Sequence, residues 1–150
     1  MRASSASEIP GPARPGVIAP PAPPAARVAS LRHAALELHK ALLDAQRVRY
    51  ERDFGRVDSS GRFLELVLRH PTFEWLRALS ALIARLDATQ DEGDGGDEEE
   101  AVLAIEDAMR SLVHPEGRNR TFTAPYWVLV EAVPDVLIAH VKLWRLLNTR

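Results

Sequence analysis

The chain has 150 residues, of which 46% are hydrophobic and 27% charged, and its formal net charge is -2. This composition is typical of a single globular domain, and the absence of cysteine excludes disulfide bonds, thiolate metal sites and a cysteine nucleophile. A cysteine-free chain fits a reducing compartment, and no apolar run reaches the ~18 residues of a membrane span, so we expect a cytoplasmic protein that does not enter a membrane.

The first 26 residues contain seven of the eleven prolines and almost no large apolar side chains. Such a segment cannot bury enough surface to offset the entropy lost on ordering, so we predict a disordered tail over residues 1–26 and a helical domain over residues 27–150. The segment lacks the continuous apolar stretch of a secretory signal, although its composition is compatible with a transit peptide. Its run Pro20-Pro21-Ala22-Pro23-Pro24 also leaves open a polyproline ligand for an SH3-like groove.

A long helix is predicted after Ser30, which can cap its start, and before Gly55, which can end it in a left-handed conformation. Its main apolar stripe follows helical spacing and consists of Leu31, Ala34, Ala35, Leu38, Ala41, Leu42, Ala45 and Val48. A second, narrower strip consists of Leu36, Leu43, Tyr50 and Phe54. Two apolar strips on one helix predict contacts on two of its sides.

Two arginines, Arg49 and Arg52, lie where the main stripe continues toward the end of this helix. They either extend their stems along the surface into water, which is the interpretation that we favour, or pair with a buried polar group. The candidate partners are Ser80 and Asp87, which lie seven residues apart on the apolar half of a later helix. With His140, these four residues form a candidate interior polar cluster.

The densest apolar stretch, residues 62–87, is predicted to form the centre of the core. Ser59 or Ser60 caps a short helix, and a corner follows at His70, because proline disfavours helical geometry in the residue before it. A longer helix then opens with Pro71. One half of that helix carries Phe73, Trp75, Leu76, Leu79, Leu82, Ile83 and Leu86. Large apolar residues at its start argue against a DNA-reading helix, which needs polar side chains there.

Acidic residues are concentrated in residues 91–107, which hold nine acids and no base, so the rest of the chain sums to +7. Three glycines lie among the first of these acids, and we therefore predict a flexible loop over residues 89–97. The spacing of Asp91, Asp94 and Asp97 differs from the alternating ligands of an EF-hand. A solvated charge run is the better interpretation.

Three further helices are predicted. The first covers about residues 98–113, the second follows a cap at Thr123, and Pro134 separates the second from the last. His140 lies on the apolar face of the last helix, where a lone histidine is more often a satisfied core residue than a ligand or a base. Five or six helices joined by short loops predict an all-α, single-domain bundle.

Three groups of residues along the chain together form a recognisable pattern. They are Leu38-His39-Lys40-Ala41-Leu42-Leu43-Asp44 with Tyr50-Glu51, then Phe73-Glu74-Trp75-Leu76 with Leu79-Ser80, and Pro134-Asp135-Val136 with Ala139-His140. The pattern covers most of residues 31–147 and resembles a group of small bacterial proteins of unknown function. The resemblance implies a bacterial cytoplasmic origin and no particular activity.

Signals for chemistry are weak. The pairs His33 with Glu37 and His39 with Asp44 have spacings found in helical metal sites, but they lie on the charged side of the first helix and lack the further motifs that complete such a site. No nucleophile elbow and no phosphate-binding glycine loop is present. We therefore assign no catalytic residue, no metal ligand and no cofactor. The arginines make no continuous basic stripe, which argues against nucleic acid.

Two functional hypotheses follow. The first is a non-enzymatic interaction module that binds itself or another protein, and the second is a bundle that encloses a small ligand or metal ion. For the first hypothesis, the excess of apolar surface on the first and last helices predicts a homodimer. The candidate interface consists of Leu36, Leu43, Ile138 and Leu146.

Overall fold

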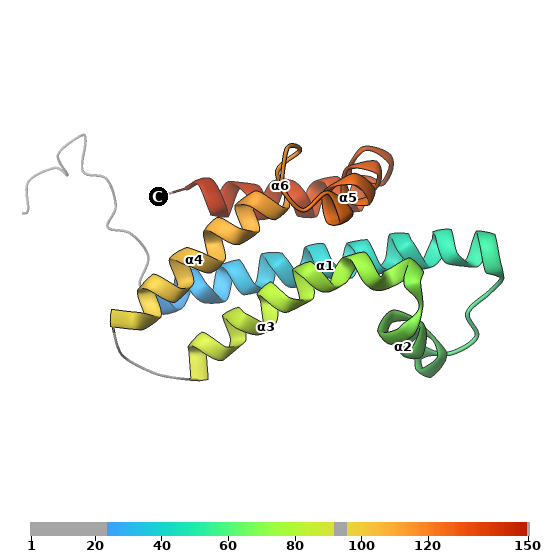
Figure 1. Cartoon of the computed structure of the whole chain (residues 1–150), viewed down its shortest axis with the longest axis horizontal. Coiled ribbons are helices and arrows are strands. Elements are labelled where there is room, and N and C mark those ends of the chain that lie inside the picture. The colour runs from blue at the N-terminus through green and yellow to red at the C-terminus, as the bar shows by residue number, and fades with distance from the viewer. Residues whose placement is uncertain (1–23, 92–95, 150) are drawn as a thin grey trace, which may run out of the picture.

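A computed structural model describes residues 24–91 and 96–149, and within these ranges the chain is helical and has no strand (Figure 1). The all-α prediction is confirmed, with six α-helices and one 3-10 helix in the described residues. In chain order the elements are α1 (Pro24–Phe54), α2 (Ser60–Arg69), η1 (Pro71–Leu76), α3 (Arg77–Asp91), α4 (Gly96–Leu112), α5 (Arg120–Ala132) and α6 (Pro134–Asn148).

The longest helix, α1, is the axis of the molecule (Figure 1). It packs mainly against α6 and α3, while α4 closes the bundle by packing on α3 and α6. The short helix α2 lies near the C-terminal end of α1 and packs chiefly on η1. The start of α4 lies toward the other end of α1, so α2 and the start of α4 are at opposite ends of the molecule.

The main apolar stripe of α1 is buried as its spacing predicts from Leu31 to Ala45, except for the partly buried Ala41, and Val48 is 66% exposed. The second strip is divided between core and surface. Leu36 and Leu43 are partly buried against the core, Tyr50 is buried, and Phe54 is 62% exposed. One core therefore uses most of the apolar surface of α1.

The helix α1 begins at Pro24, six residues before the predicted cap. The prediction of a tail up to residue 26 is wrong at its end, because residues 24–26 already belong to α1. Just after them, Val28 is buried and the side chain of Arg27 binds Glu106 and the main chain of α6. Contacts from distant helices thus stabilise a turn that its own sequence does not favour. Residues 1–23, which make up the rest of the predicted tail, lie outside the described part of the chain.

The corner before the core centre is confirmed, with a difference in the helix that follows. Ser59 caps α2 by accepting a hydrogen bond from the main-chain N–H of Arg62 at 3.1 Å, and His70 is extended before Pro71. Residues 71–76 then form the 3-10 helix η1 instead of the first turn of an α-helix. In a 3-10 helix, residues three apart share one side, and this geometry places Phe73 and Leu76 together in the core.

The predicted loop over residues 89–97 is too long. The helix α3 continues to Asp91 because Thr89 is buried and its hydroxyl donates to the main-chain oxygen of Leu86 at 2.7 Å. The helix α4 begins at Gly96, so helices cover both ends of the segment. Residues 92–95 lie outside the described part of the chain.

The cap of α5 is Asn119 and not Thr123, because the Asn119 side chain accepts a hydrogen bond from the main-chain N–H of Phe122 at 3.3 Å. The predicted break at Pro134 is confirmed, since Val133 is extended and α6 begins at the proline.

No single described helix has both the length and the apolar character to cross a membrane. Only α5 and α6 counted together do, across a bend of 116°.

A buried ion pair joins three helices. The guanidinium of Arg27 on α1 contacts both carboxylate oxygens of Glu106 on α4, at 2.6 and 3.3 Å, and the Glu106 side chain is 1% exposed. Arg27 also donates to the main-chain oxygens of Leu146 and Thr149, and Arg110 donates to that of Leu147. Two arginines therefore satisfy carbonyl groups at the C-terminal end of α6, which has no later turn to bind them.

Substitution of a core leucine tests the packing of the central stretch. Leu79 is fully buried, so Leu79→Ala should lower the free energy of unfolding by about 3 kcal/mol. Leu64→Ala on α2 is the matched control, because Leu64 is exposed and its loss should stay within about 0.5 kcal/mol. Urea unfolding measures both, and equal losses would show that α3 does not face the core.

Loss of the Arg27 charge tests the three-helix tie. Arg27→Met keeps an apolar stem but leaves the buried Glu106 carboxylate without its guanidinium, so unfolding should become easier by about 3 kcal/mol. Arg62→Met removes an exposed ion pair to Glu65 and should cost less than about 0.5 kcal/mol. Urea unfolding of the two variants provides the comparison. A loss no larger for Arg27→Met than for Arg62→Met would contradict a structural role for the tie.

Candidate functional site

The predicted interior polar cluster does not form, because its members lie in three separate places. On α3, Asp87 forms an ion pair with Arg32, and Ser80 lies 2.7 Å from the His39 Nε2 atom. Both pairs join α3 to the N-terminal half of α1, and neither Arg49 nor Arg52 contributes to them. The physical reason is that α1 and α3 pack antiparallel. Arg32 and His39, seven residues apart on α1, therefore face Asp87 and Ser80, seven residues apart on α3.

The arginines of that predicted cluster lie near the opposite end of α1. Arg49 is half-buried and Arg52 is exposed, and neither is part of an ion pair among the described residues. No acid of α3 reaches them, since Asp87 is occupied by Arg32. Their guanidinium groups therefore belong to the surface around the end of α1.

The contact of His39 with Ser80 brings a hydroxyl and an imidazole together at the surface. Burial lowers the pKa of His39, so its ring is neutral at neutral pH and can act as a base. The Ser80 hydroxyl, however, also lies 3.3 Å from the main-chain oxygen of Leu76, the last residue of η1. It thus connects the imidazole to a helix backbone, and the pair serves as an interhelical hydrogen bond of the α1–α3 contact.

His140 occupies a different, aromatic environment. Its Nδ1 atom is 2.6 Å from the Tyr126 hydroxyl oxygen, and both residues are buried. Its ring packs edge-on against Trp127 at 5.0 Å and parallel to Trp144 at 6.2 Å between centroids. Burial lowers the pKa of His140 and raises the pKa of Tyr126, so both are neutral at neutral pH. His140 is therefore a core residue with one polar partner.

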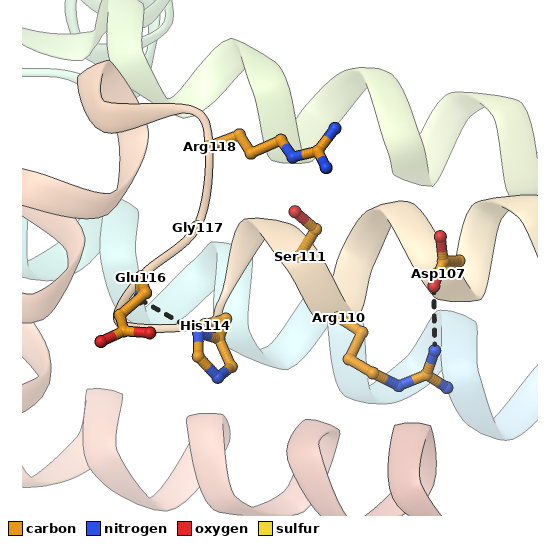
Figure 2. A pocket seen from close by; sticks show the side chains of 7 residues that line it. All are labelled: Asp107, Arg110, Ser111, His114, Glu116, Gly117 and Arg118. Carbon is orange, nitrogen blue, oxygen red and sulfur yellow. Dashed lines mark hydrogen bonds and ion pairs between the residues drawn. The ribbon is translucent and has the colours of Figure 1, made fainter.

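Among the surface hollows of the described residues, two are candidates for a ligand site, and both are small. The first, of about 280 Å³, lies between the end of α4 and the loop that follows (Figure 2). In Figure 2 the Ser111 hydroxyl and the Arg118 guanidinium lie on one side of α4, while Arg110 turns to the other side and pairs with Asp107. Gly117 holds this loop tightly, because a Cβ atom there would lie 2.3 Å from the main-chain oxygen of Ser111.

The second hollow, of about 240 Å³, lies between α1 and α6, and its charges pair with one another. Lys142 contacts Glu37 at 3.5 Å, and Lys40 contacts Asp44 at 3.1 Å. Pockets for small ligands usually enclose at least about 300 Å³ and are mainly apolar. Both hollows fall below that size and mix acids with bases, so neither selects a ligand by charge.

Residues 24–91 and 96–149 contain no group of three or more histidine, aspartate or glutamate side chains that could together hold a metal ion. The predicted pair of His33 and Glu37 is present at 3.2 Å, but its histidine is on the surface. A second predicted pair, His39 and Asp44, is separated because His39 binds Ser80 and Asp44 binds Lys40.

Large exposed apolar side chains gather instead near α2. Phe54, Leu64 and Leu68 are 62%, 59% and 60% exposed, respectively. The helix α2 buries Leu66 and partly buries Phe63 and Val67, which leaves Leu64 and Leu68 outside. Phe54, the last residue of α1, packs on the ring of His70 at 5.3 Å and so lies beside the C-terminal end of α2.

Arginines are frequent in the same segment of the chain. Residues 47–70 contain six arginines and four acids. Two of the arginines form ion pairs within this segment, Arg47 with Glu51 and Arg62 with Glu65. The other four form none among the described residues, and they are Arg49, Arg52, Arg56 and Arg69. Phe54, Leu64 and Leu68 together with these four arginines are named the α2 end.

The predicted interface differs from the α2 end. Leu36, Leu43 and Leu146 are partly buried against the core, so only part of each side chain remains exposed. Ile138 is exposed at 55% and lines the hollow between α1 and α6. The signal that could have located the α2 end is the composition of α2, in which five apolar residues out of ten exceed what one contact with η1 can bury.

No protein-family model, no curated protein sequence and no solved structure matches this chain. The resemblance to small bacterial helical proteins stays a prediction.

The buried His140 predicts that acid weakens the fold. Because burial lowers its pKa below the ordinary 6.5, the folded protein binds fewer protons than the unfolded chain as the pH falls below that value. The free energy of unfolding should be highest above about pH 6.5 and fall toward pH 5, by at most about 1.4 kcal/mol per pH unit for one group. Urea unfolding at pH 7.5 and 5.5 measures this fall, and His140→Gln should reduce it.

The control for this experiment is His33→Gln, because the His33 side chain is 76% exposed. Burial also lowers the pKa of His39. His39 should therefore account for the part of the acid-induced loss of unfolding free energy that remains in His140→Gln. The same fall in the wild type and in His140→Gln would show that protonation of His140 is not coupled to unfolding.

Proposed function

We propose that the protein is a non-enzymatic interaction module that binds a segment of a protein partner at the α2 end. The observation that carries this proposal is the exposure of three large apolar side chains, Phe54, Leu64 and Leu68, on α2 and at the adjoining end of α1. Contiguous exposed apolar surface is uncommon on proteins that act alone, and it marks sites of association.

The chemistry of the α2 end defines the partner. Apolar side chains in the centre require apolar side chains opposite them, because burial of both removes them from water. Arginines that form no ion pair among the described residues favour carboxylates at the rim of the partner, which steer the encounter and fix its orientation. The partner segment therefore combines leucine-like side chains on one face with aspartate or glutamate beside them, as in an acidic amphipathic helix.

An interior ligand, the alternative hypothesis, has less support from the geometry. The buried polar residues of the described chain are Gln46, Thr89, Glu106, Thr123 and His140. Four of them already have hydrogen-bond or ion-pair partners within the fold, which for Glu106 is Arg27 and for His140 is Tyr126. They lie on different helices and converge on no common cavity.

A designed peptide pair tests the proposal. One labelled peptide forms a helix with leucines on one face and glutamates beside them, and in the other lysines replace the glutamates. Fluorescence anisotropy should show that the full chain binds the acidic peptide at least about tenfold more tightly than the basic one, because the arginine rim selects the charge. The variant Leu64→Glu with Leu68→Glu should weaken binding of the acidic peptide by at least about tenfold.

The matched control places the same two charges elsewhere. Leu137→Glu with Ile138→Glu changes two exposed apolar residues of α6 and should leave binding unchanged. Equal affinity for the two peptides, equal loss in both double variants, or no binding by the wild type would each overturn the proposal.

A further inference from the structure

The start of α4 is rich in acids, whereas residues 47–70 hold six arginines and only four acids, among them Asp53 and Asp58. The first turn of α4 holds Asp97, Glu98 and Glu99, followed by Glu100, and none of these acids is in an ion pair among the described residues. Farther along the helix the acids are engaged, since Glu106 binds Arg27 and Asp107 binds Arg110.

An apolar residue accompanies these acids. Leu103 is 40% exposed and follows Glu99 by four residues, so the two side chains share a face of α4. Glu100 and the exposed Ala104 are related in the same way. The dipole of α4 favours acids in the first turn, but it gives no reason for a leucine to remain exposed one turn later. This face has the pattern required of a partner for the α2 end, namely carboxylates beside an apolar side chain.

We propose that a second copy of this chain is a partner of the α2 end, and that it presents the start of its own α4. This inference rests on the proposed function, of which it names one partner. The two surfaces lie at opposite ends of one molecule (Figure 1), so a chain cannot satisfy its own α2 end with its own α4. The contact joins the α2 end of one copy to the start of α4 of another. The pair still has one free α2 end and one free start of α4, so further copies can add head to tail.

Ionic strength and concentration should both control this association. Acid–arginine attraction at the rim is screened by salt, with a Debye length of about 10 Å at 0.1 M and about 30 Å at 0.01 M. Light scattering coupled to size exclusion of the full chain should therefore show a mass that rises with concentration at about 0.02 M salt. At about 0.3 M salt the association should weaken by roughly tenfold.

Two blocked variants determine the polarity of the contact. The α2-blocked variant carries Leu64→Glu and Leu68→Glu, and the α4-blocked variant carries Glu99→Lys and Glu100→Lys, all at exposed positions. Each variant alone should remain monomeric, because it lacks one of the two surfaces. An equimolar mixture should form a dimer and nothing larger, because only one intact α2 end can meet one intact start of α4. A milder α4 variant, Glu99→Gln with Glu100→Gln, should weaken association in the same direction.

The outcomes separate this inference from the proposed function. A two-fold contact between two α2 ends would let the α4-blocked variant dimerise alone, and this result would overturn the head-to-tail contact while leaving the peptide result intact. A wild type that remains monomeric at about millimolar concentration and low salt would overturn self-association, while peptide binding would still support the module. Circular dichroism of each variant confirms the helix content, so a loss of association is not mistaken for unfolding.

Discussion

Burial of α1 along two of its sides is the constraint on which the rest of the structure depends. The stripe from Leu31 to Ala45 faces a core that α3 and α6 complete. Long antiparallel contacts of this kind fix the axial offset between helices, because each side chain must enter a gap on the other helix. The offset then decides which polar residues meet. Arg32 meets Asp87 and His39 meets Ser80, and the ion pair of Arg27 with Glu106 fixes α4 and α6 to the first turns of α1.

Much of this fold could be predicted from the sequence because its signals are local. The helical spacing of apolar residues in α1, the prolines at 71 and 134, and the serine before α2 each act within a few residues of the structure that they specify. The errors have a common cause. The first turn of α1 and the last turn of α3 are helical because Val28 and Thr89 are buried against distant elements, and no local pattern reports that contact.

The same difference between local signals and distant contacts explains which parts of the candidate site could be predicted. The sequence places Ser80 and Asp87 on the apolar half of α3, but in the structure Ser80 is exposed and Asp87 is only partly buried. Their partners depend on the offset between two helices, which spacing within one helix does not contain. Similarly, Leu36 and Leu43 form a real apolar strip, yet whether a strip is covered depends on the neighbours of the helix in space. The α2 end was missed because α2 is short and its surplus becomes visible only when η1 is found to cover one side of it.

The length of α1 also decides how the charges of the molecule can act. A helix rises about 1.5 Å per residue, so the 25 residues from Arg27 to Arg52 separate the two ends by roughly 40 Å. That distance is several times the Debye length of about 8 Å at physiological salt, so the arginines of the α2 end and the acids at the start of α4 scarcely attract each other within one chain. A rigid α1 keeps them apart and prevents the molecule from folding one end onto the other. Attraction between these charges is therefore strong only across a contact, where carboxylate and guanidinium approach to hydrogen-bonding distance and water is partly excluded. The internal core that makes α1 straight is thus also what leaves both ends free to bind outward.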